Sequence, residues 1–245
     1  KLERPGQAIS RLAELGVVDI ILPELRGCKG VMQEGGWHIY DVFDHTMVAL
    51  DSSEKDLDLR IALLLHDIGK PPLRRLEDGR AFFTGHDRLS AKMAKKVMNR
   101  LRYSTKRIER VTGIIGNHMA NIPETDRGLR RMVRRIGEEN LDIFIQHRLA
   151  DLQAMDTNEV ANEINANIEL GRKLHEIVEA KPPLSRRDLV VNGDDLKREL
   201  GLTEGRLLGK IFDRLMELVL DDPQMNQRDI LLAEAEKIVH DRNST

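Results

Sequence analysis

The chain has 245 residues, of which 40% are hydrophobic, so it is long enough for one large or two modest domains with a sizeable buried core. No apolar run approaches the roughly 20 residues of a membrane-spanning helix and no signal peptide opens the chain, so the sequence argues against an integral membrane protein and predicts a soluble one. The net charge of -2 is unevenly distributed along the chain. The segment from Arg88 to Arg135 contains fourteen lysines and arginines but only three acidic residues, a local charge of +11, which predicts a basic face.

The composition predicts an all-α fold. Aromatic residues make up only 3% of the chain, while Leu, Ile, Ala, Met, Glu, Lys and Arg dominate, a mixture that favours helices over sheets. The single cysteine, Cys28, excludes an intrachain disulfide and favours a reducing, cytoplasmic location. Because the first residue is Lys1 rather than methionine, we expect a processed protein or a piece of a longer one.

Helix signals open the chain. Pro5 marks a helix start, Gly16 marks a stop, and a short helix pair is expected to end near Leu25. A glycine-rich connector follows. The spacing of apolar residues in IYDVFDHTMVAL then predicts a helix that carries His45 beside its packed face.

The stretch that carries the most chemical information is IALLLHDIGK, at 61–70. Its apolar run predicts a buried helix, and Gly69 and the following proline pair predict where that helix ends. His66 and Asp67 are then expected at the edge of the hydrophobic core. Imidazole and carboxylate together suit a divalent transition metal. An adjacent His-Asp pair alone also fits a solvated surface.

Two further histidines are expected at helix ends. A short polar loop containing Asp78 and Gly79 leads to a helix whose N-terminal boundary holds His86. A second helix, which starts near Thr105, ends with His118.

The segment DRGLRRMVRRIG predicts a helix with five arginines on one face. The planar guanidinium group of arginine can donate two parallel hydrogen bonds to the oxygens of a phosphate. This face therefore favours contact with a nucleic-acid backbone over the alternative of a merely solvated surface. The candidate RNA-binding residues are Arg127, Arg130, Arg131, Arg134 and Arg135.

The next helix, LDIFIQHRLADLQAMD, carries Asp151 as a candidate metal ligand. His147, one turn earlier, is either a spare ligand or a surface residue. A polar helix then runs to about Ala180, and the Pro182-Pro183 pair predicts the start of a smaller tail with three helices.

Four histidines and two aspartates on successive helices are enough to hold two metal ions. In such a site Asp67 could bridge the ions, which activate water and stabilise the charge on a phosphate. Lys70 could add a positive charge for the phosphate, or lie at the surface as a helix C-terminal lysine. The candidate ligands are His45, His66, Asp67, His86, His118 and Asp151.

This order of residues, H…HD…H…H…D, resembles the HD-domain metal-dependent phosphohydrolase superfamily. The resemblance implies one or two divalent ions, chosen from Mn, Fe, Co, Ni, Zn or Mg, with Asp67 and Lys70 in catalytic roles. It implies hydrolysis of phosphomonoesters or phosphodiesters of nucleotides or RNA 3′ ends. The matching motifs are DHT around His45, HDIGK, Gly85-His86, Asn117-His118, and RLAD around Asp151.

The flanking segments LPEL and YDVFDHT and the tail from Pro183 are similar to bacterial tRNA nucleotidyltransferases, the CCA-adding enzymes, and to poly(A) polymerases. This resemblance implies neck remnant helices at 1–26, an HD phosphohydrolase domain at 27–181 and a helical RNA-binding tail at 182–245. The Gly-Ser turn and paired carboxylates of a nucleotidyltransferase head are absent, so this chain alone is not expected to add nucleotides. A parent protein would supply that head, and tRNA is the expected partner.

Two functions follow from these observations. In the first, the chain is an active metal-dependent phosphohydrolase, and Asp67→Ala removes bound metal and activity. In the second, it is the tRNA-binding body and tail of a CCA-adding enzyme with a structural or vestigial HD site. The second function predicts that RNA affinity falls steeply as the salt concentration rises. This salt dependence should be less steep in Arg130→Ala and in Arg134→Ala.

Overall fold

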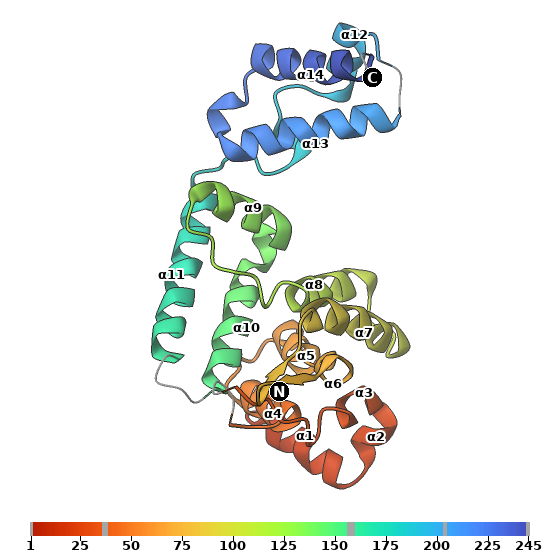
Figure 1. Cartoon of the computed structure of the whole chain (residues 1–245), viewed down its shortest axis with the longest axis vertical. Coiled ribbons are helices and arrows are strands. Elements are labelled where there is room, and N and C mark those ends of the chain that lie inside the picture. Colours follow the sequence, from red (N-terminus) through yellow and green to blue (C-terminus); the bar gives the residue numbers. More distant parts are fainter. Residues whose placement is uncertain (1, 36–38, 156–159, 203–204, 244–245) are drawn as a thin grey trace. The chain divides into compact units, whose positions relative to one another are not determined.

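The chain is mostly helical, which confirms the predicted all-α class (Figure 1). None of the described helices is both long enough and apolar enough to cross a lipid bilayer. The computed structural model describes residues 2–35, 39–155, 160–202 and 205–243.

The polypeptide forms two compact units, each built from two segments of the chain. Unit 1 comprises Lys1–Ile122 and Glu139–Arg172, and unit 2 comprises Pro123–Glu138 and Lys173–Thr245. The division into neck, HD domain and tail stays a prediction.

Unit 1 begins with three short helices, of which the first packs on α4. Helix α1 starts at Pro5, where proline fits because the first helical N–H has no partner within the helix. A Cβ at Gly6 would stand 2.0 Å from the carbonyl oxygen of Met47 on α4, so only glycine permits this approach. The bounds are α1 (Pro5–Glu14), α2 (Val17–Ile21), α3 (Pro23–Arg26) and α4 (Val42–Asp51).

Helix α5 (Leu57–Leu65) is the buried central helix that the apolar run predicts. Its N-terminus is capped by Asp56, whose carboxylate accepts a 2.8 Å hydrogen bond from the Leu59 N–H. The helix packs against α4, α8 and α10, so the residues that follow it lie inside unit 1. Its buried apolar residues are Leu59, Ile61, Ala62, Leu63 and Leu65.

The proline pair after α5 begins a helix rather than stopping one. Helix α5 already ends at Leu65, and the short helix α6 (Lys70–Leu73) starts with Pro71 in its first turn. Proline is compatible with this position because the first N–H groups of a helix need no intrahelical acceptor.

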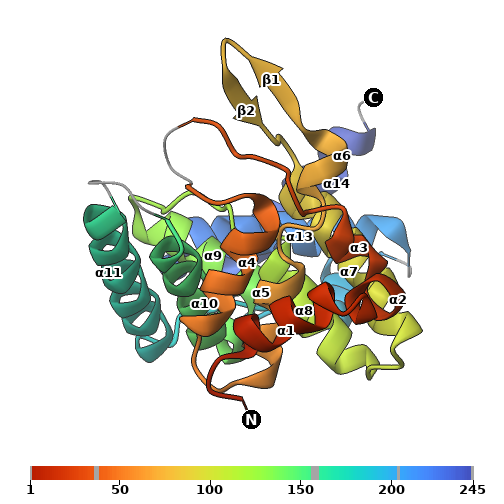
Figure 2. The ribbon, with the colours of Figure 1, turned by 90° about the horizontal axis from the view of Figure 1, so that it is seen from below.

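The predicted polar loop that follows is a β-hairpin, the main departure from the expected elements (Figure 2). Strands β1 (Arg75–Glu77) and β2 (Arg80–Phe82) pair in antiparallel register. Asp78 and Gly79 between them both have positive φ, the conformation of a tight two-residue hairpin turn. An Asp-Gly pair is a known signal for this turn.

Helices α7, α8 and α10 also pack against α5. Helix α7 starts at His86 as predicted, with Gly85 before it in the left-handed conformation at φ 82°. Ser104 caps α8 by accepting from the Arg107 N–H. The bounds are α7 (His86–Arg100), α8 (Thr105–Ile115), the 3-10 turn η1 (Glu138–Asn140), α10 (Leu141–Gln153) and α11 (Val160–Glu179).

Unit 2 has its own apolar core, which Leu196, Ile211, Leu215 and Leu231 share. The three helices predicted for the tail are present as α12, α13 and α14. The bounds are α9 (Asp126–Ile136), η2 (Arg186–Asp188), α12 (Gly193–Leu200), α13 (Arg206–Asp221), η3 (Pro223–Met225) and α14 (Arg228–Asn243).

Candidate metal centre

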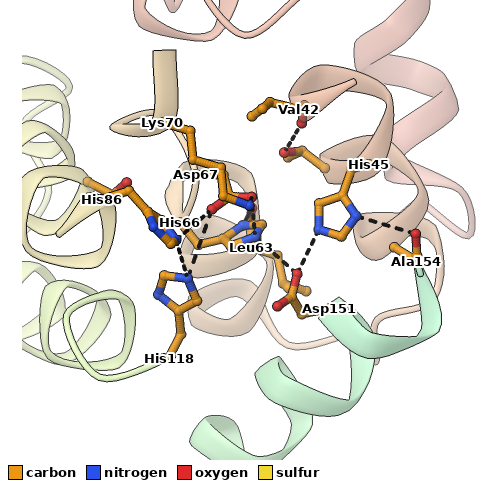
Figure 3. Close-up of polar contacts among 12 residues, drawn as sticks. Val42, His45, Leu63, His66, Asp67, Lys70, His86, His118, Asp151 and Ala154 are labelled. Atoms are coloured by element: carbon orange, nitrogen blue, oxygen red, sulfur yellow. Dashed lines mark hydrogen bonds and ion pairs between the residues drawn. The ribbon is translucent and has the colours of Figure 1, made fainter. Parts of the chain in front are cut away.

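Six predicted ligand residues from separate parts of the sequence meet inside unit 1 (Figure 3). Each comes from a helix or from the turn just after one, so the helix packing fixes their positions. Five are buried, and the Asp151 side chain is 14% exposed. The set consists of His45 on α4, His66 and Asp67 after α5, His86 at the start of α7, His118 after α8 and Asp151 on α10.

Asp151 and His66 form the centre of one half of the site. The Oδ1 of Asp151 lies 2.8 Å from His45 Nε2 and 3.1 Å from His66 Nε2. The same His66 nitrogen lies 3.1 Å from Oδ2 of Asp67. Two imidazole nitrogens and two carboxylates therefore converge here.

The other half of the site forms around the second oxygen of Asp67. Its Oδ1 lies 3.3 Å from His86 Nε2 and 3.9 Å from His118 Nε2. The two oxygens of Asp67 thus face different groups of histidines. A carboxylate in this position suits a bridge between two ions.

All four imidazole rings are oriented by backbone carbonyls. A carbonyl oxygen only accepts, so a neutral ring that donates from Nδ1 to its carbonyl keeps the lone pair on Nε2, the arrangement that metal binding requires. Such contacts to the other nitrogen are typical of histidines that bind metals. The pairs are His45 with Ala154 at 3.3 Å, His66 with Leu63 at 2.7 Å, His86 with Phe83 at 2.9 Å and His118 with Ile115 at 2.7 Å. His45 Nε2 also lies 2.8 Å from Oδ1 of Asp151.

The ligand atoms are poorly satisfied by the protein alone. His66 Nε2 and both oxygens of Asp67 are buried, and none of them forms a well-formed hydrogen bond within the part of the chain that the structure describes. The Nε2 atoms of His86 and His118 lie 3.2 Å apart, where two lone pairs repel unless a cation lies between them. The donor set of imidazoles and carboxylates therefore fits divalent transition ions.

The electrostatics of the site also favour a cation. Burial alone would lower the pKa of His66, but the charges of Asp67 and Asp151 outweigh burial and raise it to about 10. Burial, followed by the charge on His66, lowers the pKa of His118 to about 4. Burial also holds the pKa of His147 well below its usual range. Two carboxylates in this site thus favour a positive charge at His66, while burial favours the neutral, metal-binding form of His118 and His147.

Lys70 contacts Asp67 directly rather than lying at the surface. Its Nζ is 2.7 Å from Oδ2 of Asp67 and donates to Oε1 of Gln33 at 2.7 Å. The side chain is buried and borders a cleft of about 750 Å³ that His86, His118 and Asp151 also line. A cleft of this volume is large enough for a small-molecule ligand.

The sequence did not identify three of the polar residues that line this cleft. Arg148 donates to the carbonyl oxygens of His118 and Ala120 at 2.8 and 2.7 Å and so holds the turn that carries His118. The sequence places Arg148 beside Asp151 but gives no sign of this contact. The three residues are Gln33, Arg148 and Asn167.

The predicted arginine face on α9 has protein partners within unit 2. Arg130 donates to the carbonyl oxygens of Leu220 and Asp221, both at 2.8 Å. Arg127 and Arg131 pair with the Asp221 carboxylate at 2.6 Å, while Arg131 and Arg134 pair with Glu217 at 2.7 and 3.5 Å. Arg135 is exposed. RNA binding by these five arginines stays a prediction.

Comparison with known families agrees with this geometry. The model of the family described as HD domain matches residues 38–235. The chain therefore belongs to the HD domain family.

Proteins similar to this chain include tRNA nucleotidyltransferases. The chain is 34% identical to an A-adding tRNA nucleotidyltransferase of Deinococcus radiodurans, over 86% of this chain and 50% of the relative. It is 33% identical to a CC-adding tRNA nucleotidyltransferase of Thermus thermophilus, over 87% of this chain and 49% of the relative. A multifunctional CCA protein of Burkholderia multivorans is 33% identical over 40% of this chain and 24% of that protein. The chain spans about half the length of the first two relatives.

Proposed function

We propose that this chain is a divalent-metal-dependent phosphohydrolase that acts on phosphomonoesters or phosphodiesters of nucleotides or RNA 3′ ends. The observation that carries the proposal is the Asp67 carboxylate, whose two oxygens face two separate groups of imidazole nitrogens. Membership of the HD domain family supports it.

The ligands in this proposal are the six residues of the candidate metal centre. Bound divalent ions would supply Lewis acidity and stabilise the charge that develops on a phosphate. The four backbone contacts hold the imidazoles in one tautomer, and Arg148 holds the turn that carries His118. Lys70 offsets the charge of Asp67 and adds positive charge at the edge of the cleft.

The experiment is a phosphatase assay beside a 2′,3′-cyclic phosphodiesterase assay, on chelator-treated protein with and without added Mn²⁺, Fe²⁺, Co²⁺, Ni²⁺, Zn²⁺ or Mg²⁺. We expect turnover of one substrate class to appear with an ion and to disappear with chelator. Absence of turnover of both substrates with every ion would refute the hydrolase proposal.

The second candidate function is an RNA-binding body and tail with a structural HD site, as part of a CCA-adding enzyme. The names of the relatives support a tRNA partner, and we propose that a nucleotidyltransferase head belongs to the same system. We also propose that the chain divides into neck, HD domain and tail, and that the protein is cytoplasmic.

A basic face on α7 favours RNA contact in unit 1. Arg88, Lys92, Lys95 and Lys96 are exposed at helical spacing and have no ion-pair partner among the described residues. His86 and Ser90 lie on the buried side of α7, so the basic face lies on the side of this helix that points away from the metal centre. Four of the five α9 arginines contact carboxylates or backbone carbonyls of unit 2, whereas these four cations on α7 are available to phosphates.

Removing two charges from α7 is expected to weaken the salt dependence of RNA binding. Each lost phosphate contact lowers the salt slope by about 0.7 to 0.9, so Lys92→Ala with Lys96→Ala should lower it by roughly 1.4 to 1.8. The measurement is fluorescence anisotropy with tRNA over a salt series. The charge-matched control is Arg134→Ala with Arg135→Ala on α9. A loss of slope in the control pair alone would assign RNA to α9, and no loss in either pair would contradict both surfaces.

A further inference from the structure

His147 is a fifth buried histidine beside the metal centre. It lies on α10 one turn before Asp151, and residues four apart share one face of a helix. The sequence left it as either a spare ligand or a surface residue, and its exposed fraction of 0% excludes the surface. The contacts of this imidazole are therefore with the protein interior.

The His147 ring lies at the same spacing from the candidate ligands as they do from one another. Its centroid is 5.2 Å from the His66 ring and 5.7 Å from the His118 ring. The corresponding distances are 5.2 Å between His66 and His118 and 5.1 Å between His86 and His118. His147 thus extends the same cluster of imidazoles.

Both ring nitrogens of His147 are buried without a hydrogen-bond partner among the described residues. This distinguishes His147 from the other four rings, whose Nδ1 atoms each contact a backbone carbonyl. A neutral imidazole still carries one N–H and one lone pair, and leaving both unpaired inside a protein is costly. An apolar side chain of similar size would avoid that cost, so a ligand that uses a ring nitrogen explains the histidine better.

We propose that His147 is an additional imidazole ligand of the metal centre, on the side of His66 and His118. This inference rests on the metal centre of the proposed function. A fifth nitrogen ligand shifts the preference of the site towards Co²⁺, Ni²⁺ and Zn²⁺ and away from Mg²⁺, which favours oxygen ligands. His147 therefore favours a transition ion over Mg²⁺ at this site.

The test compares metal binding of His147→Leu with that of the wild-type chain. Co²⁺ and Mg²⁺ are titrated into chelator-treated protein, with calorimetry for affinity and the visible absorption of bound Co²⁺ for its coordination. We expect Co²⁺ affinity to fall about 10- to 100-fold, its absorption bands to shift and Mg²⁺ affinity to stay within a few-fold. The control is His175→Leu, an exposed histidine on α11, which should match the wild type.

A second measurement covers the case in which His147→Leu does not fold. Wild-type protein labelled with ¹⁵N-histidine is titrated with Zn²⁺, and the His147 ring nitrogens are followed by NMR. A large shift of one ring nitrogen on binding is expected. An unchanged Co²⁺ spectrum and affinity in His147→Leu, or an unshifted His147 resonance in the wild type, would overturn the proposal.

None of these readouts uses turnover. A chain that binds metal through His147 and hydrolyses no phosphate ester would refute the proposed hydrolase and leave this inference intact.

Discussion

Replacing Asp67 with alanine is expected to abolish phosphohydrolase activity and to lower metal affinity by at least roughly 100-fold. The substitution removes both oxygens that face the two groups of imidazoles, so each half of the site loses a ligand. It also removes one of the two carboxylates that lie 3.1 Å from His66 Nε2, and the carboxylate that pairs with Lys70. Metal content by mass spectrometry and a phosphatase assay would measure the two effects.

The fold should survive this change because Asp67 lies in the turn between α5 and α6, outside any helix. The matched control is Asp56→Ala at the other end of α5. It removes a helix cap at a cost of about 1 kcal/mol and should leave metal binding intact. Circular dichroism should show wild-type helix content for both variants. Full activity in Asp67→Ala would contradict the proposal that the Asp67 carboxylate bridges two metal ions.

Replacing Gly69 with alanine is expected to damage both stability and the metal centre. A Cβ at this position would stand 2.7 Å from the backbone nitrogen of Ser90 and 2.9 Å from the carbonyl oxygen of His86. These atoms belong to the first turns of α7, so the turn that carries Asp67 must move away from the helix that carries His86. We expect a loss of about 1–3 kcal/mol in the free energy of unfolding together with weaker metal binding.

The control for Gly69→Ala is Gly6→Ala, which also places a Cβ against backbone. The clash there is with Met47 on α4, and Gly6 lies on α1. Gly6→Ala should therefore lose stability while retaining the metal stoichiometry of the wild type. Chemical denaturation and metal titration would separate the two variants. Equal metal affinity in Gly69→Ala and the wild type would show that this close approach does not position the site.

Four of the six candidate ligands could be predicted from local signals in the sequence, because each lies at a helix end, whereas His45 and Asp151 lie inside helices. His66 and Asp67 follow an apolar run, His86 opens a helix after Gly85, and His118 follows the end of another. Helix ends are set by neighbouring residues, so short-range patterns locate them. The order of the motifs along the chain resembles that of the HD-domain superfamily, and this resemblance indicates that the residues form one site.

The contacts that depend on distant residues could not be predicted. The α9 arginines form an amphipathic face in the sequence, but their partners Glu217 and Asp221 lie more than 80 residues away. The partnerless ring of His147 is likewise visible only once α10 has packed against α5. The hairpin at Asp78 is a different case, because the Asp-Gly turn signal was present but its flanking strands are only three residues long.

The measurement that tests the central claim most directly is the metal content of the wild-type chain after chelation, reconstitution with a divalent transition ion and removal of excess ion. Mass spectrometry of the metal against protein concentration gives the stoichiometry. The geometry around Asp67 predicts one to two ions per chain. A chain that retains none, while its circular dichroism shows the helices intact, would contradict a metal centre at these residues.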